Sequence, residues 1–257
     1  MPNSQGRFVW HDLATSNTDA AASFYTQVTP WKTQPGDYDP NYTMWVNDGQ
    51  PLGGFEALSD ELKARNIAPQ WLPYVYVYDV DACTRQVKML GGEVRMGPHE
   101  VPNVGCWSVI TDPHGARIGL YEPEEEAPSE FRTPRRGEFS WHELGTTDYK
   151  AAFDFYHALL GWEKTSEFDM GEMGIYFMFG KKGVPYGGMF NRRPEMPPPN
   201  WLSYIRVYDV KTTAAMVKKL GGTVHQGPME VPGGDTIAMC SDPQGAPIAF
   251  HTPSATG

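Results

Sequence analysis

The sequence predicts an α+β fold built from four copies of a βαβββ module. Three observations support this prediction. The chain repeats itself at half its length, each half repeats a strand–helix–strands order, and a charged, proline-rich segment separates the halves. With 257 residues, the chain is long for one compact domain and sufficient for two.

The internal repeat is clearest in two pairs of segments. Residues 71–80 (WLPYVYVYDV) and 201–210 (WLSYIRVYDV) match at seven of ten positions. Residues 90–102 (LGGEVRMGPHEVP) and 220–232 (LGGTVHQGPMEVP) match at nine of thirteen. The offset stays at 130 to 131 residues along the chain. Chance agreement does not hold a register over that distance, so the sequence indicates a duplicated unit.

Between the copies lies a segment that cannot bury an apolar face. Residues 122–137 read EPEEEAPSEFRTPRRG, with a carboxylate run, three prolines and three arginines. This composition is typical of a solvated linker. We therefore predict an N-terminal domain at residues 1–122, a linker at 123–136 and a C-terminal domain at 137–257.

Each half repeats one order of elements. In the first quarter, the spacing predicts a strand, a helix behind a capping Asn17 or Thr18, and two strands around a turn. These elements cover residues 8–13, 18–28, 42–46 and 52–55. In the second quarter, a strand and a helix closed by Gly91 and Gly92 precede three short strands. Those elements cover residues 71–77, 79–90, 93–96, 105–111 and 117–121.

The order of these motifs resembles the vicinal oxygen chelate superfamily, which includes glyoxalases, bleomycin-resistance proteins and extradiol dioxygenases. The resemblance spans residues 7–253. It rests on a Phe-Tyr pair in the first helix, the LGG passage from helix to strand, and the D-P-x-G turn before each half's last strand. The chain looks like the two-domain, glyoxalase-like group with W-x-[DE]-L-x-T near each domain's start. The resemblance implies that the modules pair so that their sheets curve around a cup.

The resemblance also implies where a metal is held. Metal-binding members place a His or Glu on a module's first strand, seven residues before the Asp that opens the helix. They place a Glu four residues after the Gly of the D-P-x-G turn. In this sequence these positions hold Trp10, Leu72, Gly119, Trp141, Leu202 and Ala249. None is a metal-ligating residue type, so we predict no cofactor. The alternative is a divalent metal held by Glu143, His251 and a third residue.

Strand alternation predicts which side chains line the cups. Leu144 leads into a helix and is expected to pack on it. His142 then shares the face of Leu144, while Glu143 shares the cup face with Trp141. By the same parity, the first cup is lined by Trp10, Asp12, Leu72, Tyr74, Tyr76 and Tyr121, and the second by Trp141, Glu143, Leu202, Tyr204, Arg206 and His251.

Both predicted linings are aromatic with a few polar groups, which is typical of a pocket for a flat or apolar small molecule. The alternative is that these aromatic side chains fill the cups as core. The second cup adds an acid, a cation and a titratable base. A buried Glu beside a Trp is expected to have a raised pKa, so Glu143 and His251 are the candidate catalytic residues. A structural ion pair between Glu143 and Arg206 is the competing interpretation.

The composition excludes some classes of binding partner. The formal net charge is −10 and the pI about 5.1, which disfavours nucleic acid and anionic membrane surfaces as partners. No apolar run reaches membrane-spanning length, residues 1–10 have no apolar core that could serve as a signal peptide, and the three cysteines have no paired spacing. We therefore expect a cytoplasmic protein, and we leave a homodimer open.

The leading functional hypothesis is a protein that binds a small aromatic or apolar molecule without a metal. It either sequesters this molecule or transforms it by acid–base chemistry through Glu143. One alternative is a metal-dependent lyase or dioxygenase with a rearranged site. A second alternative is an inactive scaffold whose cups are packed shut.

Overall fold

The structure is a computed structural model that describes residues 4–36, 39–64, 66–124 and 132–254. Residues 125–131 of the predicted linker lie outside the described residues. The first half contains β1 (Phe8–Thr15), α1 (Thr18–Val28), β2 (Lys32–Pro35), β3 (Thr43–Asn47), β4 (Gln50–Ala57), α2 (Asp60–Ala64), β5 (Gln70–Tyr76), α3 (Val80–Met89), β6 (Glu93–Val101), β7 (Gly105–Thr111) and β8 (Arg117–Pro123). The second half contains β9 (Phe139–Thr146), α4 (Tyr149–Leu160), β10 (Glu163–Asp169), the 3-10 helix η1 (Gly171–Met173), β11 (Ile175–Lys181), β12 (Val184–Asn191), β13 (Asn200–Arg206), α5 (Val210–Lys219), β14 (Thr223–Glu230), β15 (Thr236–Ser241) and β16 (Pro247–Thr252).

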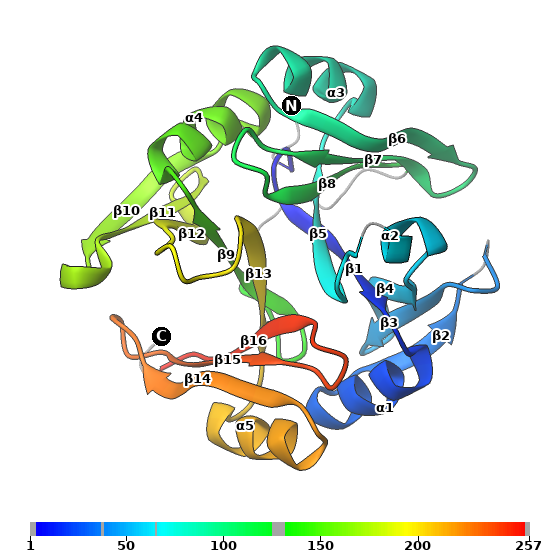
Figure 1. Cartoon of the computed structure of the whole chain (residues 1–257), viewed down its shortest axis with the longest axis vertical. Helices are drawn as coiled ribbons and strands as arrows, with labels where there is room; N and C mark the ends of the chain where they lie inside the picture. Colours follow the sequence, from blue (N-terminus) through cyan, green and yellow to red (C-terminus); the bar gives the residue numbers. More distant parts are fainter. Residues whose placement is uncertain (1–3, 37–38, 65, 125–131, 255–257) are drawn as a thin grey trace. The chain divides into compact units, whose positions relative to one another are not determined.

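The strands form two mixed eight-stranded sheets, one from each half (Figure 1). The strand order is β2-β3-β4-β1-β5-β8-β7-β6 in the first sheet and β10-β11-β12-β9-β13-β16-β15-β14 in the second. The first strand of each module pairs parallel with its last strand, and the hairpins are antiparallel. The predicted α+β fold of four βαβββ modules is therefore confirmed.

Each long helix begins at a side chain that caps its first turn. The side chains of Asn17, Asp79, Asp148 and Asp209 accept backbone N–H bonds from residues two or three positions later. The cap of α1 is therefore Asn17. At the other end of α3, the chain reverses at Gly91, whose φ of +85° lies in the left-handed region that favours glycine.

Packing divides the chain into two compact units that cut across the sequence halves. Unit 1 comprises residues 1–10, 73–132 and 141–201, and unit 2 comprises residues 11–72, 133–140 and 202–257. Unit 1 therefore combines α3 with α4, and unit 2 combines α1 with α5 (Figure 1). The sheets follow the sequence halves, whereas each hydrophobic core takes side chains from both halves.

A buried hydrogen-bonded bridge lies in the core of unit 1. The indole N–H of Trp201 donates to the hydroxyl of Tyr156 over 3.1 Å, and this hydroxyl donates to Asp112 over 3.1 Å. Burial, and then the charge of Asp112, raise the pKa of Tyr156, so its hydroxyl stays protonated and able to donate.

The same bridge occurs in unit 2. There Trp71 donates to the hydroxyl of Tyr25 over 2.8 Å, and Tyr25 donates to Asp242 over 3.1 Å. In both units the tyrosine comes from one half of the chain and the aspartate comes from the D-P-x-G turn of the other half. The repeated Phe-Tyr and D-P-x-G motifs therefore supply the tyrosine and the aspartate of the bridge in each shared core.

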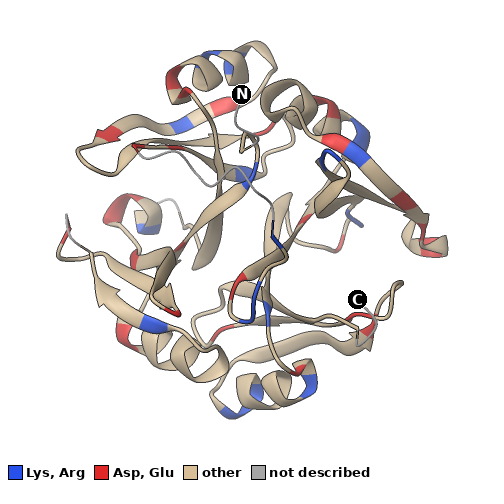
Figure 2. Ribbon diagram, turned by 180° about the vertical axis from the view of Figure 1, so that it is seen from behind, with Lys and Arg blue, Asp and Glu red and all other residues tan. Residues whose placement is uncertain are grey.

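Charged residues of both signs are interspersed over the helices (Figure 2). In the ranges that the structure describes, no helix is both long and apolar enough to cross a bilayer.

The Tyr156 bridge predicts a specific loss of stability. Tyr156→Phe keeps the ring but leaves a buried indole N–H and a buried carboxylate without this partner, which costs roughly 1–3 kcal/mol. Urea unfolding should show this loss for Tyr156→Phe and for its counterpart Tyr25→Phe. Tyr208→Phe, at an 82% exposed position, is the control. A Tyr156→Phe variant as stable as this control would contradict the prediction.

The shared cores also predict that one half does not fold by itself. A chain of residues 1–124 keeps its sheet strands but loses α4 and α5, the partners of its own helices. We expect size-exclusion chromatography and circular dichroism to show an unfolded chain or a self-associated species. Addition of residues 125–257 should restore the cooperative fold. A monomeric residue 1–124 fragment that unfolds cooperatively would count against the packing described above.

Candidate functional site

In unit 1, a chain of hydrogen bonds ends at Glu143 on β9. The indole N–H of Trp141 donates to the hydroxyl of Tyr176 over 2.8 Å, and this hydroxyl donates to Oε2 of Glu143 over 2.9 Å. Glu143 is 8% exposed, whereas Trp141 and Tyr176 are half-buried. Leu144 packs in the core with Phe155. Trp141 and Glu143 thus share one face of β9, as strand alternation predicts.

A glycine makes room for this arrangement. Gly188 on β12 is the register partner of Glu143, and a Cβ atom there would lie 2.2 Å from the ring of Tyr176. Burial, and then the charge of Glu143, raise the pKa of Tyr176, so this hydroxyl is a neutral donor. Phe190, also half-buried, stacks on Tyr176 with ring centroids 6.3 Å apart. A buried carboxylate is therefore flanked by three half-buried aromatic rings.

Unit 2 contains the counterpart of this pair. The hydroxyl of Tyr42 donates to Oδ1 of Asp12 over 2.6 Å, and a Cβ atom at Gly54 would lie 2.1 Å from the ring of Tyr42. Sequence reasoning predicted both carboxylates but missed both tyrosines. The available signal was the glycine pair at 53–54 and again at 187–188, where the missing side chain admits a ring.

The other predicted aromatic residues of the first cup lie in unit 1. Tyr74 pairs in register with Gly119, and Tyr76 with Tyr121, on β5 and β8. Tyr74 and Tyr76 are buried and pack as core residues. Tyr121 donates to the carbonyl of Val104 over 2.8 Å. Trp10, on β1, is half-buried.

The positions that correspond to the family's metal ligands do not fit a divalent ion. Trp10, Leu72, Trp141, Leu202 and Ala249 lack ligand atoms of the required type. At the sixth position, a Cβ atom on Gly119 would lie 2.0 Å from the ring of Tyr74, so the ring occupies the space a carboxylate side chain needs. Over the part of the chain that the structure describes, no three His, Cys, Asp or Glu residues gather closely enough to hold a metal.

Three residues predicted for the second cup belong to unit 2. Tyr204 is buried. Arg206 pairs in register with His251, and its guanidinium donates to the carbonyl of Pro134. His251 has its own polar partners, Ser140 at 2.9 Å and Asp235 at 2.8 Å. Glu143 belongs to unit 1, where Tyr176 donates to it, so the two candidate catalytic residues have different hydrogen-bond partners.

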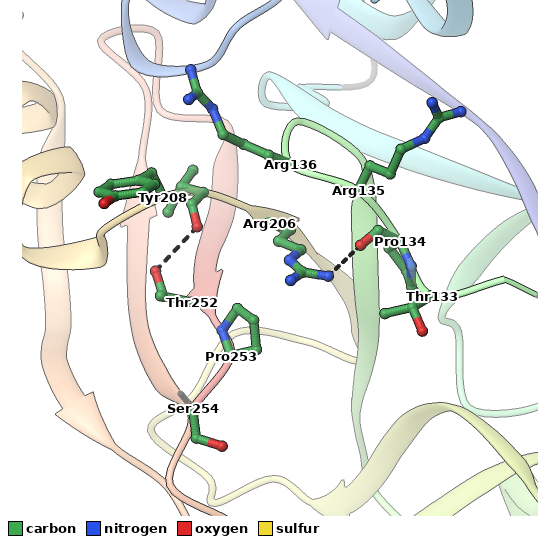
Figure 3. A pocket seen from close by; sticks show the side chains of 10 residues that line it. Thr133, Pro134, Arg135, Arg136, Arg206, Tyr208, Thr252, Pro253 and Ser254 are labelled. Carbon is green, nitrogen blue, oxygen red and sulfur yellow. Dashed lines mark hydrogen bonds between the residues drawn. The ribbon is translucent and has the colours of Figure 1, made fainter. Parts of the chain in front are cut away.

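A groove of about 570 Å³ lies beside Arg206 in unit 2. It is lined by residues 133–136, 206–208 and 252–254 (Figure 3). Figure 3 shows the Arg206 guanidinium at the carbonyl of Pro134 and the Thr252 hydroxyl at the carbonyl of Val207. The side chains of Arg135 and Arg136 extend from the same short segment.

The two histidines next to the site carboxylates have a structural role. The ring of His142 stacks on Phe8 at 3.5 Å, and the ring of His11 stacks on Phe139 at 3.5 Å. Each histidine therefore contacts a phenylalanine of the other half. Nδ1 of His142 also lies 3.4 Å from the carbonyl of Tyr186. Burial lowers the pKa of His142 to about 3, so the ring is neutral in the folded protein.

The buried cysteines lack the features of activated nucleophiles. Burial raises the pKa of Cys83 to about 11 and that of Cys240 to about 12. Their thiols are therefore protonated at neutral pH, which is typical of core cysteines.

Comparison with known families agrees with the fold. Residues 139–250 match the family described as "Glyoxalase/Bleomycin resistance protein/Dioxygenase superfamily", and residues 9–121 match "Glyoxalase-like domain". The chain therefore belongs to the glyoxalase, bleomycin resistance protein and dioxygenase superfamily, with one such domain in each half.

Two curated relatives span nearly the whole chain. "Putative glyoxylase CFP32" of Mycobacterium tuberculosis is 31% identical over 261 residues, covering 97% of this chain and 96% of that protein. "Anthracycline biosynthesis protein DnrV" of Streptomyces peucetius is 30% identical over 256 residues, covering 94% of this chain and 91% of that protein.

Solved structures share the fold at low sequence identity. The Mn(II)-bound glyoxalase from Novosphingobium aromaticivorans gives a TM-score of 0.67 at 14% identity, covering 98% of this chain and 82% of that chain. The 2,3-dioxygenase LapB from Pseudomonas sp. KL28 gives a TM-score of 0.67 at 12% identity, covering 98% of this chain and 94% of that chain.

The neutral, buried His142 predicts an acid-sensitive fold. Its pKa is about 3 in the folded protein against 6.5 for the ordinary side chain. Between these values the unfolded chain binds a proton that the folded chain does not, so the free energy of unfolding falls as the pH falls. At pH 5 this residue alone removes roughly 2 kcal/mol.

Urea unfolding at pH 7.5 and pH 5 measures this effect. The stability difference between the two pH values should be smaller in His142→Phe than in the wild type by about that amount. His99→Gln, which changes an exposed histidine, should retain the full difference. Equal differences in the wild type and His142→Phe would show that His142 is protonated in both states or in neither.

Proposed function

We propose that the protein binds a small aromatic metabolite at Trp141, Tyr176, Phe190 and Glu143, without a metal. The observation that carries this proposal is the buried Glu143 among three half-buried aromatic rings. Flat rings offer dispersion contact to a planar ligand, and a carboxylate accepts a hydrogen bond from a ligand hydroxyl. The ligand is therefore an aromatic or apolar molecule with at least one acidic O–H or N–H group.

The second step of the proposal concerns proton transfer. The carboxyl group of Glu143 is buried, so few water molecules compete for it, and Tyr176 fixes its orientation through Oε2. A carboxylate held in this way is suited to take a proton from a bound ligand and return it to another atom. Trp141 also holds the tyrosine in place by donating its indole N–H to the tyrosine hydroxyl. The geometry supports an acid–base isomerisation or elimination better than a nucleophilic reaction.

The residues at the family's metal positions support this choice over metal-dependent chemistry. The positions of the family's metal ligands hold side chains that do not ligate, and one of them is covered by the ring of Tyr74. In addition, one relative carries the name of an anthracycline biosynthesis protein, and anthracyclines are fused aromatic ring systems with phenolic hydroxyl groups. We therefore take a hydroxylated anthraquinone as the first ligand class to test.

The test is a titration with a dihydroxyanthraquinone, followed by quenching of tryptophan fluorescence and by calorimetry. We expect binding by the wild type after dialysis against a chelator. Glu143→Gln should weaken binding at least about tenfold, because a side-chain hydrogen bond to a charged group contributes roughly 1.5–3 kcal/mol. Asp12→Asn, the equivalent change in the other half, is the matched control.

Two outcomes would reject the proposal. One is unchanged binding and turnover in Glu143→Gln. The other is binding that disappears with chelator and returns with a stoichiometric divalent ion.

A further inference from the structure

A second set of hydrogen-bonded polar side chains lies in unit 2, and its serine, Ser140, directly precedes Trp141 on β9. The hydroxyl of Ser140 lies 2.9 Å from Nδ1 of His251, and Nε2 of His251 lies 2.8 Å from Oδ2 of Asp235. The backbone N–H of Ser254 donates to the other oxygen, Oδ1, of Asp235 over 2.8 Å. A serine, a histidine and an aspartate are thus connected in the order of a nucleophile, a base and an orienting acid, with the two ring nitrogens exchanged relative to the usual triad.

The donors and acceptors in this chain can be assigned from their chemistry. The ionised carboxylate of Asp235 only accepts, so Nε2 of His251 carries the hydrogen. In a neutral imidazole Nδ1 is then an acceptor, and the Ser140 hydroxyl donates to it over 2.9 Å, the shorter of its two contacts, since the carbonyl of Tyr204 lies 3.4 Å away. The side chain of His251 is 16% exposed, so the base is shielded without being sealed from solvent. The hydrogen-bond pattern therefore polarises the O–H bond of Ser140.

The first half shows that the fold does not require these hydrogen-bonded side chains. The counterparts of Ser140, His251 and Asp235 in the first half are Val9, Tyr121 and Gly105. None of the three can act as a nucleophile, base or orienting acid in this arrangement. The equivalent sheet positions therefore carry the Ser–His–Asp hydrogen bonds in the second half but not in the first.

The groove of about 570 Å³ is lined by residues that are neighbours of Asp235 and His251. Ser254 lines the groove and binds Asp235 through its N–H, and Arg206 lines the groove and pairs in register with His251 (Figure 3). Arg135 and Arg136 also line it. The guanidinium of Arg136 is exposed and has no ion pair among the described residues.

The residues that line this groove differ in charge from their counterparts in the first half. Thr252 and Ser254 of the groove correspond to Glu122 and Glu124 in the first half, and Arg206 corresponds to Tyr76. The second half thus presents hydroxyl groups where the first presents carboxylates, and an arginine where the first presents a tyrosine. A groove with this lining favours a ligand that carries a carboxylate or phosphate group.

We infer that Ser140 is the nucleophile of an acyl-transfer site that accepts small anionic esters. The Ser140 oxygen attacks the ester carbonyl carbon, and its proton passes to Nδ1 of His251. The C–O bond to the alcohol then breaks, and His251 returns the proton to the leaving oxygen. Water next attacks the acyl-serine with His251 again as base, which releases the carboxylic acid and restores the hydroxyl. Asp235 is the positioning residue that holds the ring, and Arg136 attracts the anionic group.

The test uses the full chain and two activated esters, mono-p-nitrophenyl glutarate, which carries a carboxylate, and neutral p-nitrophenyl acetate. We expect release of p-nitrophenol with a preference for the glutarate ester. We expect an acyl group on the peptide containing Ser140 when the reaction is quenched in acid and mapped by mass spectrometry. His251→Gln should lower the acylation rate on the order of 100-fold or more.

The Ser140 variants separate loss of the nucleophile from loss of the fold. Ser140→Val introduces the residue found at the equivalent position of the first half, so we expect a native circular dichroism spectrum with no acylation. Ser23→Ala, at an exposed serine of α1 in the same unit, should acylate like the wild type. Asp235→Asn should change the pH profile of acylation, and Arg136→Gln should reduce the preference for the glutarate ester.

The inference is overturned if Ser140→Val, natively folded, releases p-nitrophenol at the wild-type rate. It is equally overturned if the wild type carries no acyl group at Ser140, or carries it at another residue.

Discussion

The hydroxyl of Tyr156 joins two segments that are distant in the sequence. It accepts from Trp201 and donates to Asp112, and Tyr25 makes the same connection between Trp71 and Asp242. Buried polar groups must be satisfied, since each one left without a partner costs about 1–3 kcal/mol. Each bridge can be completed only with a turn from the other half. This requirement ties α4 to the turn after β7, and α1 to the turn after β15.

The fold and the direction of the site side chains follow from short-range patterns in the sequence. The 130-residue repeat reveals the modules, and alternation anchored at Leu144 places Glu143 beside Trp141. The strand β2 could not be found this way, because its four residues, KTQP, are all exposed and show no alternation. The sequence also did not predict that the halves share their cores. Tyr156 and Asp112 lie far apart in the sequence, and no local pattern indicates that they are in contact.

The tyrosines that donate to the two carboxylates show why the sequence predicted only part of the site. Tyr42 lies just before β3, 30 positions beyond Asp12, and Tyr176 lies on β11, 33 positions beyond Glu143. In each sheet one further strand separates the tyrosine's strand from the strand of the carboxylate. Pairing of strands at that distance depends on register, which a sequence pattern specifies weakly where strands are irregular. The glycine pairs were visible, but they indicate only that something approaches the backbone closely. The placement of His251 beside Ser140 and Asp235 depends in the same way on the register of three strands.

The exchange of core residues between the halves has a consequence for the origin of this chain. A single-half ancestor could have completed the same Trp–Tyr–Asp bridges only with a second copy of itself, as a two-fold symmetric homodimer. Such a dimer dissociates on dilution, whereas a covalent tandem does not, because the tether replaces free concentration by a high effective concentration. After the fusion, the two copies could also diverge in sequence. One surface could then keep Glu122 and Glu124 while its twin acquired Thr252 and Ser254, a divergence that a symmetric homodimer cannot express.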